Sequence, residues 1–523
     1  MQRRIRELLL PVALLAALYL PSTTLGQTPA NPDSALQAIL DGLKGTPLTL
    51  QEAVRLGQSN ATSVRTAQAE MNAAQGAERR ERGYFDPELF LLLNHLDQEI
   101  PTSSPFAGAD VLKTEQSTYQ GGVRLNLPIG TQLELAMTGD QLKTNSAFAS
   151  LNPQYTSFGS LSLRQPLLGG FAASGRKELS KAEEEQEAGS ARYNQQLIAV
   201  SAEVERAYWD LYAAERDYAV QKLTRDRAEA FLAETEVRAG SGLVGPNQVA
   251  NARTFLAQQE LLLFDRDELL GRRSDQLASL IGVRPESETP QFLPVDEPPR
   301  DFPLEPVDVL VERALENNLD LQAAERDVNA ARALADAASW EALPSVDLIG
   351  SYGGSGLAGT SQVVNFPGLT TLPAPGRSMG DALSQGVNLD YPTWSVGLEL
   401  TVPIGFRSGL GEQSRLEAQV LSAQQRSVGV SRQLEERVRA THRELSNAKG
   451  RLKAARDGVE AAQEQVRIGL LEFHNGRATA FELVRLGEDF AVAQLRYSDA
   501  LVRAAKAAAT MRELTSGIVN TDR

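Results

Sequence analysis

Hydrophobic positions in two long stretches of the chain recur at three- and four-residue spacing, the period of an α-helix with one apolar face. Residues 178–238 contain no proline and one glycine, Gly189, and residues 413–467 behave alike. The apolar stripes are Leu197, Val200, Val204, Ala207, Leu211 and Ala214 in the first stretch and Leu416, Val420, Ala423, Val430, Leu434 and Val438 in the second. At 1.5 Å per residue, about 60 helical residues span ~90 Å. Such helices need neighbours along their whole length, in a coiled-coil rod or a barrel-like arrangement.

Shorter segments alternate apolar and polar positions with the period of two that is typical of β-strands. They are residues 123–127, 133–137, 161–164 and 396–402. Strands with lipid on one side and water on the other show this pattern, and so does an ordinary half-buried sheet. The stretches 101–116, 139–155 and 353–390 are rich in Gly, Ser, Thr, Asn and Pro, so we predict long loops there.

The chain is internally duplicated. A shift of 257 positions places Asn60 on Asn317 and, without a gap, Pro87 on Pro344. Segments 161–166 and 398–403 then correspond at a different offset, as do 237–240 and 466–469. Each half therefore reads as helix, strands, long helix, break and helix. We expect a tail at 27–47, repeats at 48–284 and 307–517, a proline-rich linker at 285–306 and a tail at 518–523.

The N-terminus has the features of a secretory signal peptide. Arg3, Arg4 and Arg6 precede an apolar run from Leu8 to Leu20, which is too short to span a membrane, and we expect cleavage after Gly26. No later stretch is apolar enough for a transmembrane helix, so any embedding in a membrane requires strands that close a barrel. Four to six strands are too few to close one, and the subunit must then share a barrel with copies of itself.

Composition and charge narrow the function. The 523 residues include no cysteine, so disulfides and thiolate metal sites are excluded, and without the signal peptide the net charge is 49 − 66 = −17. An acidic surface argues against nucleic-acid binding. His95, His442 and His474 have no ligand spacing among them, and no catalytic constellation is present, so we expect neither an enzyme nor a cofactor.

Together these features resemble the TolC-type outer-membrane efflux protein family over residues 48–517. The resemblance rests on the segments that begin at Asn60 and Asn317, taken as helix openings, and on the strand-to-helix corners 165–170 and 402–405. The helix-hairpin turns 241–245 and 475–479 match as well. It implies an α+β fold: a homotrimer in which each subunit gives four strands to one twelve-stranded outer-membrane β-barrel, above a periplasmic tunnel of antiparallel coiled-coil helices.

The resemblance also implies partners and sites. A periplasmic adaptor and an inner-membrane pump would dock at the tunnel tip, with the turn residues Gly242, Leu243, Val244, Gly476 and Arg477 as adaptor contacts. Glu482, Arg485 and Gln248 would line the tunnel constriction. Gln248 is matched here to Arg485, where the family often has an acid, and Glu482 and Arg485 either pair across helices or leave the gate less cation-selective. Glu482 is equally well explained as a solvated helix residue.

Two further questions stay open at this stage. The segments 119–127 and 131–137 form one hairpin more than the resemblance implies, so either one strand is wrongly assigned or the hairpin extends above the barrel. A periplasmic adaptor or coiled-coil scaffold without a barrel is the main alternative function, although it would have a single helical hairpin between compact β-domains. A secreted enzyme with a helical stalk is a weaker one. The nature of the exported substrate, small molecule or protein, is not determined by the sequence.

Overall fold

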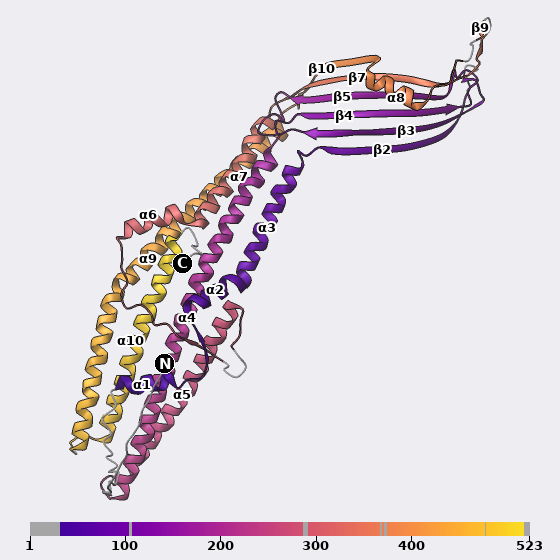
Figure 1. Cartoon of the computed structure of the whole chain (residues 1–523). Helices are drawn as coiled ribbons and strands as arrows, with labels where there is room; N and C mark the ends of the chain where they lie inside the picture. Colours follow the sequence, from indigo (N-terminus) through magenta and orange to yellow (C-terminus); the bar gives the residue numbers. More distant parts are fainter. Residues whose placement is uncertain are drawn as a thin grey trace, which may run out of the picture. The chain divides into compact units, whose positions relative to one another are not determined.

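The computed structural model describes residues 32–103, 107–285, 291–366, 369–370, 374–475 and 477–516. The expected signal peptide, Gly476 and the expected C-terminal tail lie outside them. The chain forms two compact units (Figure 1). Within the described residues, the sheet unit comprises Gly45–Ala214, Glu268–Asp457 and 496–516, and the hairpin unit comprises 32–44, Glu215–Asp267 and Gly458–Leu495.

The duplication is visible in the helices of the sheet unit. Helices α2 (Leu50–Asn60) and α3 (Thr62–Gly83) correspond to α6 (Val307–Asn317) and α7 (Leu319–Glu341), and the first residues of each pair differ by the same 257 positions. The helix expected to open each half is therefore present but consists of two pieces. One residue separates the pieces in each half.

That residue has an extended backbone, which ends the first helix. Ala61 has ψ 131° and Asn318 has ψ 121°. Asn318 also caps the second piece, because its side chain accepts a hydrogen bond from the backbone N–H of Leu321 at 3.1 Å. The prediction that Asn60 and Asn317 open helices is therefore wrong: each is the last residue of the preceding helix.

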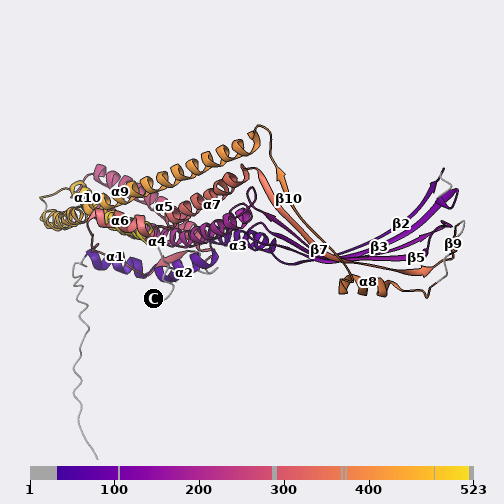
Figure 2. The ribbon, with the colours of Figure 1, turned by 90° about the horizontal axis from the view of Figure 1, so that it is seen from above.

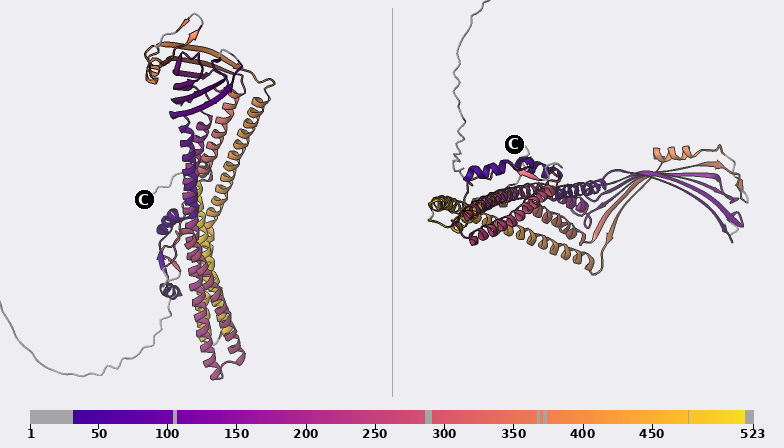
Figure 3. Two further views of the ribbon diagram at one scale, coloured as in Figure 1. Left: turned by 90° about the vertical axis from the view of Figure 1, so that its right-hand side faces the viewer. Right: turned by 90° about the horizontal axis from the view of Figure 1, so that it is seen from below.

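Six strands form one antiparallel sheet, in the order β10-β7-β5-β4-β3-β2. The strands run side by side in Figures 1 and 3. Their bounds are β2 (Glu88–Pro101), β3 (Val111–Asn126), β4 (Gln132–Thr144), β5 (Leu151–Pro166), β7 (Ser345–Ser361) and β10 (Tyr391–Thr401). Two short strands, β8 (Asn365–Phe366) and β9 (Leu369–Thr370), form a separate pair.

The structure corrects the predicted loops. Residues 111–116 belong to β3, most of 139–155 belongs to β4 and β5, and 353–390 contains the end of β7 and helix α8 (Met379–Asn388). The Thr, Ser, Gln and Gly residues on which the loop prediction rests occupy strand positions in β3, β4, β5 and β7. The extra hairpin is real, and β3 and β4 pair with β2 and β5 along the sheet.

Helix α8 packs on one face of the sheet over β4, β5 and β7 (Figure 2). Ser157 Oγ donates a hydrogen bond to the carbonyl oxygen of Ala382 at 2.6 Å. A Cβ atom at Gly356 would lie 2.0 Å from the same oxygen. The glycine-rich composition of β7 thus has a packing reason, since only a strand without side chains there lets the helix backbone approach.

The long helices are α4 (Lys177–Gly240) and α9 (Arg407–His474), each followed by a shorter one, α5 (Pro246–Ile281) and α10 (Ala480–Thr515). The predicted apolar stripes are buried at Val200, Val204 and Leu211 of α4. In the sheet unit, Leu434 and Val438 of α9 form a core with α6 and the end of α10. Between those apolar contacts α4 and α10 are joined by ion pairs, such as Glu205 to Arg512 at 2.6 Å.

Part of the linker is held to the first repeat. Strand β6 (Phe292–Pro294) pairs in parallel with β1 (Thr46–Leu48). The fully buried Tyr208 hydroxyl accepts hydrogen bonds from the backbone N–H groups of Val295 and Asp296 at 3.0 and 3.1 Å, and it donates to the Leu48 carbonyl oxygen at 2.9 Å. An extended linker was expected, and its residues 286–290 lie outside the described part of the chain.

The hairpin unit contains helix α1 (Pro32–Asp41), which lies in the stretch expected to be an N-terminal tail. Leu36 of α1 packs against Ala219, Val220 and Leu223 of α4, with Leu495 of α10 at the edge of this core. The rest of the unit consists of the ends of α4 and α9, α5 up to Asp267 and the start of α10.

Candidate functional site

One face of the sheet is apolar and exposed. The cross-strand register places a residue of each strand on one rung, and all six are large apolar or aromatic side chains. Their exposed fractions are 82% for Leu89, 38% for Val123, 58% for Leu135, 50% for Leu161, 50% for Tyr352 and 72% for Trp394. A soluble protein rarely exposes an apolar band of this width, so the face requires an apolar partner or lipid.

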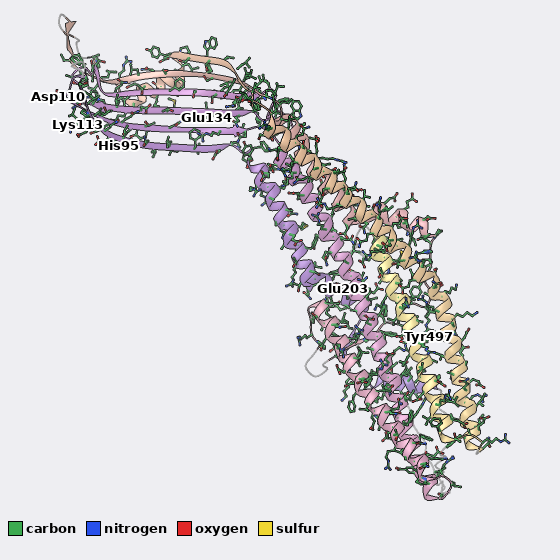
Figure 4. The ribbon with its side chains drawn as sticks, turned by 180° about the vertical axis from the view of Figure 1, so that it is seen from behind. His95, Asp110, Lys113, Glu134, Glu203 and Tyr497 are labelled. Atoms are coloured by element: carbon green, nitrogen blue, oxygen red, sulfur yellow. The ribbon has the colours of Figure 1, made fainter. Side chains whose placement is uncertain are left out.

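The opposite face of the sheet carries ion pairs between neighbouring strands, although exposed apolar side chains, among them Leu92, Phe158 and Leu357, also lie on it. Arg164 of β5 lies 2.5 Å from Asp347 of β7 and 3.3 Å from Glu399 of β10. Arg124 of β3 lies 2.9 Å from Glu134 of β4, which Figure 4 labels. A sheet with one lipid-type face and one such charged face suits a wall between lipid and water.

The predicted adaptor turns are the two helix ends of the hairpin unit. After α4, the N–H of Gly242 bonds to the carbonyl oxygen of Ala239 and the N–H of Leu243 to that of Arg238, both at 3.0 Å. This pair of bonds is a Schellman motif, and Gly242 has the left-handed φ of +74° that the motif requires. Leu243 is 75% exposed in the turn.

The second turn ends α9 with the same long-range bond. The N–H of Arg477 bonds to the carbonyl oxygen of Glu472 at 2.8 Å, and Arg477 is exposed. Leu243 therefore corresponds to Arg477, a shift of 234 positions. The expected match of Gly240 with Gly469 is wrong, because Gly469 lies inside α9, where its Cα faces Leu486 of α10.

Of the predicted constriction residues, Gln248 and Glu482 lie in the first turns of α5 and α10, and Arg485 lies in the second turn of α10. Glu482 caps α10: its carboxylate accepts from the Thr479 N–H at 2.7 Å, while the Thr479 hydroxyl accepts from the Glu482 N–H at 3.3 Å. No ion pair joins Glu482 to Arg485 within the described residues. Since α5 starts at Pro246 and α10 at Ala480, Gln248 corresponds to Glu482 and not to Arg485 as expected.

Gln248 lines a groove of about 470 Å³ between α5 and α10, and Glu482 and Arg485 are not among its lining residues. Its other lining residues include Phe255, Phe481 and Glu488. The side chain of Gln259 on α5 donates to Glu488 at 3.4 Å. Partial burial, helped by the neighbouring Asp489, raises the pKa of Glu488. Sequence reasoning missed Phe481 and Glu488, although the place of Phe481 in the first turn after a hairpin end could have pointed to it.

The described residues contain no group of three His, Asp or Glu side chains that could hold a metal ion. None of their helices is both long and apolar enough to cross a membrane.

Residues 310–517 match the family model described as outer membrane efflux protein. No curated protein matches the chain by sequence. Among solved structures, the CmeC outer membrane channel of Campylobacter jejuni has a TM-score of 0.65 at 13% identity, covering 91% of this chain and 87% of that one. The outer membrane protein VceC of Vibrio cholerae has a TM-score of 0.62 at 15% identity, covering 90% and 96%.

The open-state MtrE outer membrane channel of Neisseria gonorrhoeae is similar too, with a TM-score of 0.60 at 17% identity, covering 90% of this chain and 89% of that one. Identities this low establish the fold. The family match over the second repeat and the shared fold together confirm the resemblance found in the sequence. Residues 310–517 thus match the outer membrane efflux protein family, and the chain has the fold of the TolC-type outer-membrane channels.

Proposed function

We propose that this chain is one subunit of a homotrimeric outer-membrane channel that releases small molecules or proteins delivered by an inner-membrane pump and a periplasmic adaptor. The observation that carries the proposal is the six-residue apolar rung on an exposed sheet face, opposite a face of cross-strand ion pairs. A periplasmic scaffold has no use for an exposed apolar band of six strands. Lipid can cover such a band without leaving backbone groups unsatisfied, because the N–H and C=O groups between neighbouring strands already bond to each other.

Fractionation tests the location. We expect the protein in the outer-membrane fraction, extractable only with detergent, and as a species of three subunits by native mass spectrometry. Purified protein should form ion-conducting channels in planar bilayers. Recovery from the soluble periplasmic pool would refute the channel and favour the scaffold alternative.

The adaptor is proposed to contact the two hairpin turns. Because the chain lacks cysteine, a single Cys can be placed at Leu243 or Arg477 and labelled with a photo-crosslinker without background. Both side chains are exposed and neither is needed for the turn's backbone hydrogen bonds. Glu203→Cys, on an exposed position of α4 in the sheet unit, is the matched control (Figure 4). Cross-linking to a co-expressed adaptor from both turns and not from the control is the expected result.

The constriction is proposed to lie at the first turns of α5 and α10, with Gln248, Glu482 and Arg485 around it. The equivalence of Gln248 and Glu482 provides a matched pair of tests. Glu482→Gln removes a charge but keeps an oxygen that can cap Thr479, and Gln248→Glu adds a charge at the corresponding place. We expect the first to lower and the second to raise the ratio of cation to anion permeability. Unchanged ratios in both variants would remove these residues from the pore.

A further inference from the structure

The two repeats give unequal numbers of strands to the sheet. Strand β2 corresponds to β7, since their first residues, Glu88 and Ser345, differ by the same 257 positions as the helices before them. Strand β5 precedes α4 as β10 precedes α9. The hairpin of β3 and β4 therefore has no counterpart in the second repeat. It is an insertion between two strands that the duplication would otherwise make neighbours.

This hairpin is an integral part of the sheet. Each strand of the hairpin pairs without interruption with the strand next to it in the sheet. Strand β3 pairs with β2 from Glu88↔Arg124 to Pro101↔Val111. Strand β4 pairs with β5 from Gln132↔Arg164 to Leu142↔Gln154. A flap above the sheet would leave β2 and β5 paired with each other. Within the described residues they share no register, because β3 and β4 stand between them.

Both faces of the hairpin continue the pattern of the other strands. Val123 and Leu135 occupy the middle of the apolar rung, between Leu89 and Leu161. On the polar face, Arg124 pairs with Glu134 across the hairpin itself. A hairpin standing in water above a membrane would have no reason to keep one apolar face at the level of its neighbours' apolar residues.

Helix α8 marks where this apolar band ends. It covers the rung that contains Gly139, Ser157 and Gly356, four residues further along each strand than the rung of Leu135, Leu161 and Tyr352. Beyond it the same face carries cross-strand ion pairs, Lys143 with Glu115 at 3.2 Å and Lys113 with Glu99 at 2.5 Å. Along its length the hairpin therefore has an apolar zone followed by a charged zone, as a membrane-spanning strand does.

We propose that β3 and β4 are part of the membrane wall, so that three subunits close a barrel of 3 × 6 = 18 strands in place of the twelve that the family resemblance implies. The inference rests on the proposed trimeric channel. The free edges are β2 and β10, and their unpaired backbone groups are too costly to leave in lipid. The β10 edge of one copy therefore pairs with the β2 edge of the next.

The added strands widen the exit of the channel. Barrel diameter grows roughly in proportion to strand number, so 18 strands give about 1.5 times the diameter of twelve and about 2.2 times the cross-section. Barrels of 16–18 strands hold an open aqueous lumen. The outer-membrane segment of this channel accordingly accepts hydrated solutes wider than a twelve-stranded barrel admits.

Disulfide mapping tests the strand order in the native trimer. In this cysteine-free chain the pairs Leu89→Cys with Val123→Cys and Leu135→Cys with Leu161→Cys should both cross-link within one subunit on oxidation. The pair Leu89→Cys with Leu161→Cys should not, because two strands separate these positions. The opposite result, a cross-link only between Leu89→Cys and Leu161→Cys, would place the hairpin outside the wall and overturn the proposal.

Polymer exclusion measures the bore. Nonelectrolyte polymers of graded size are added on the extracellular side of channels in planar bilayers, and the radius that no longer lowers conductance is recorded. The control lacks Val111–Thr144 and so has four strands per subunit. We expect a cutoff radius about 1.5 times larger for the intact chain. Equal radii would overturn the proposal, as would a native mass of two copies, which closes only twelve strands. A protein that forms no channel at all refutes the proposed function instead.

Discussion

The buried carboxylate of Glu215 makes the stability of this protein depend on pH. Glu215 lies on α4 and is 8% exposed. Burial raises the pKa of its carboxyl to about 7 from the ordinary value of 4.5, and the nearby positive charge of Arg216 opposes that rise only in part. Between these two pH values the folded chain keeps a proton that the unfolded chain has released. Raising the pH through this window therefore destabilises the folded state.

The magnitude follows from the shift. A tenfold change in acidity corresponds to 1.36 kcal/mol, so the raised pKa of Glu215 lowers the free energy of unfolding by about 3 kcal/mol per subunit once the pH exceeds 7. Below pH 4.5 the cost is absent, because the side chain is protonated in both states. Glu215→Gln replaces the acid by a neutral group of the same shape. We expect it to raise stability above pH 7 by up to about 3 kcal/mol and to change little at pH 4.

Thermal unfolding of the detergent-solubilised protein, followed by circular dichroism from pH 4 to 8.5, measures this difference. The midpoint of the variant should separate from that of the parent between pH 4.5 and 7 and then remain a constant distance above it. Glu203→Gln, a change of the same kind at an exposed position of the same helix, should give parallel curves at every pH. A difference for Glu215→Gln that is independent of pH, or a variant less stable at pH 8, would contradict the assigned burial cost.

Three further predictions concern stability and packing. Tyr208→Phe removes an acceptor from the Asp296 N–H, whereas the Val295 N–H keeps the Leu48 carbonyl oxygen at 3.1 Å. Unfolding should therefore become easier by about 1–3 kcal/mol in denaturant titration, and a loss below about 0.5 kcal/mol would contradict this role of the hydroxyl. Thr479→Ala removes one half of the α10 cap and should cost about 1 kcal/mol, visible as faster amide exchange in the first turn of α10 only. Gly356→Val should displace α8 from the sheet and expose it to protease, while Gly397→Val, where a Cβ meets nothing within 4 Å, should leave the digestion pattern unchanged.

Local patterns account for what could be predicted. Helix stripes such as Val200 and Val204 are visible in sequence because a helix buries every third or fourth residue, whatever its partner. The duplication is visible because two copies share their turn residues and prolines. The strand of Val396 to Val402 was recognisable because its apolar and polar positions alternate without interruption.

The prediction that Gln248 corresponds to Arg485 was wrong because the two repeats differ in length. Repeats drift in length, α4 having 64 residues and α9 68, so residue similarity near Gly240 and Gly469 gave the wrong offset. Only the backbone hydrogen bonds that end each helix establish that Gln248 and Glu482 are equivalent. Glu482 itself looked like either a pore residue or a solvated one, and its cap to Thr479 adds a structural role.

The sequence by itself determined the long helices and the duplication, and it predicted the resemblance to outer membrane efflux proteins, because each of these depends on neighbours along the chain. Only the tertiary structure decided that residues 111–116 of β3 and the glycine-rich end of β7 are strand residues and that six strands make one sheet. Polar residues and glycine have weak strand propensity of their own, so whether they form a strand depends on the neighbouring strands and helices that pack against them. Gly356 lies in a strand where the backbone of Ala382 packs against it, and Val123 belongs to the exposed apolar rung because Leu89 and Leu135 flank it there.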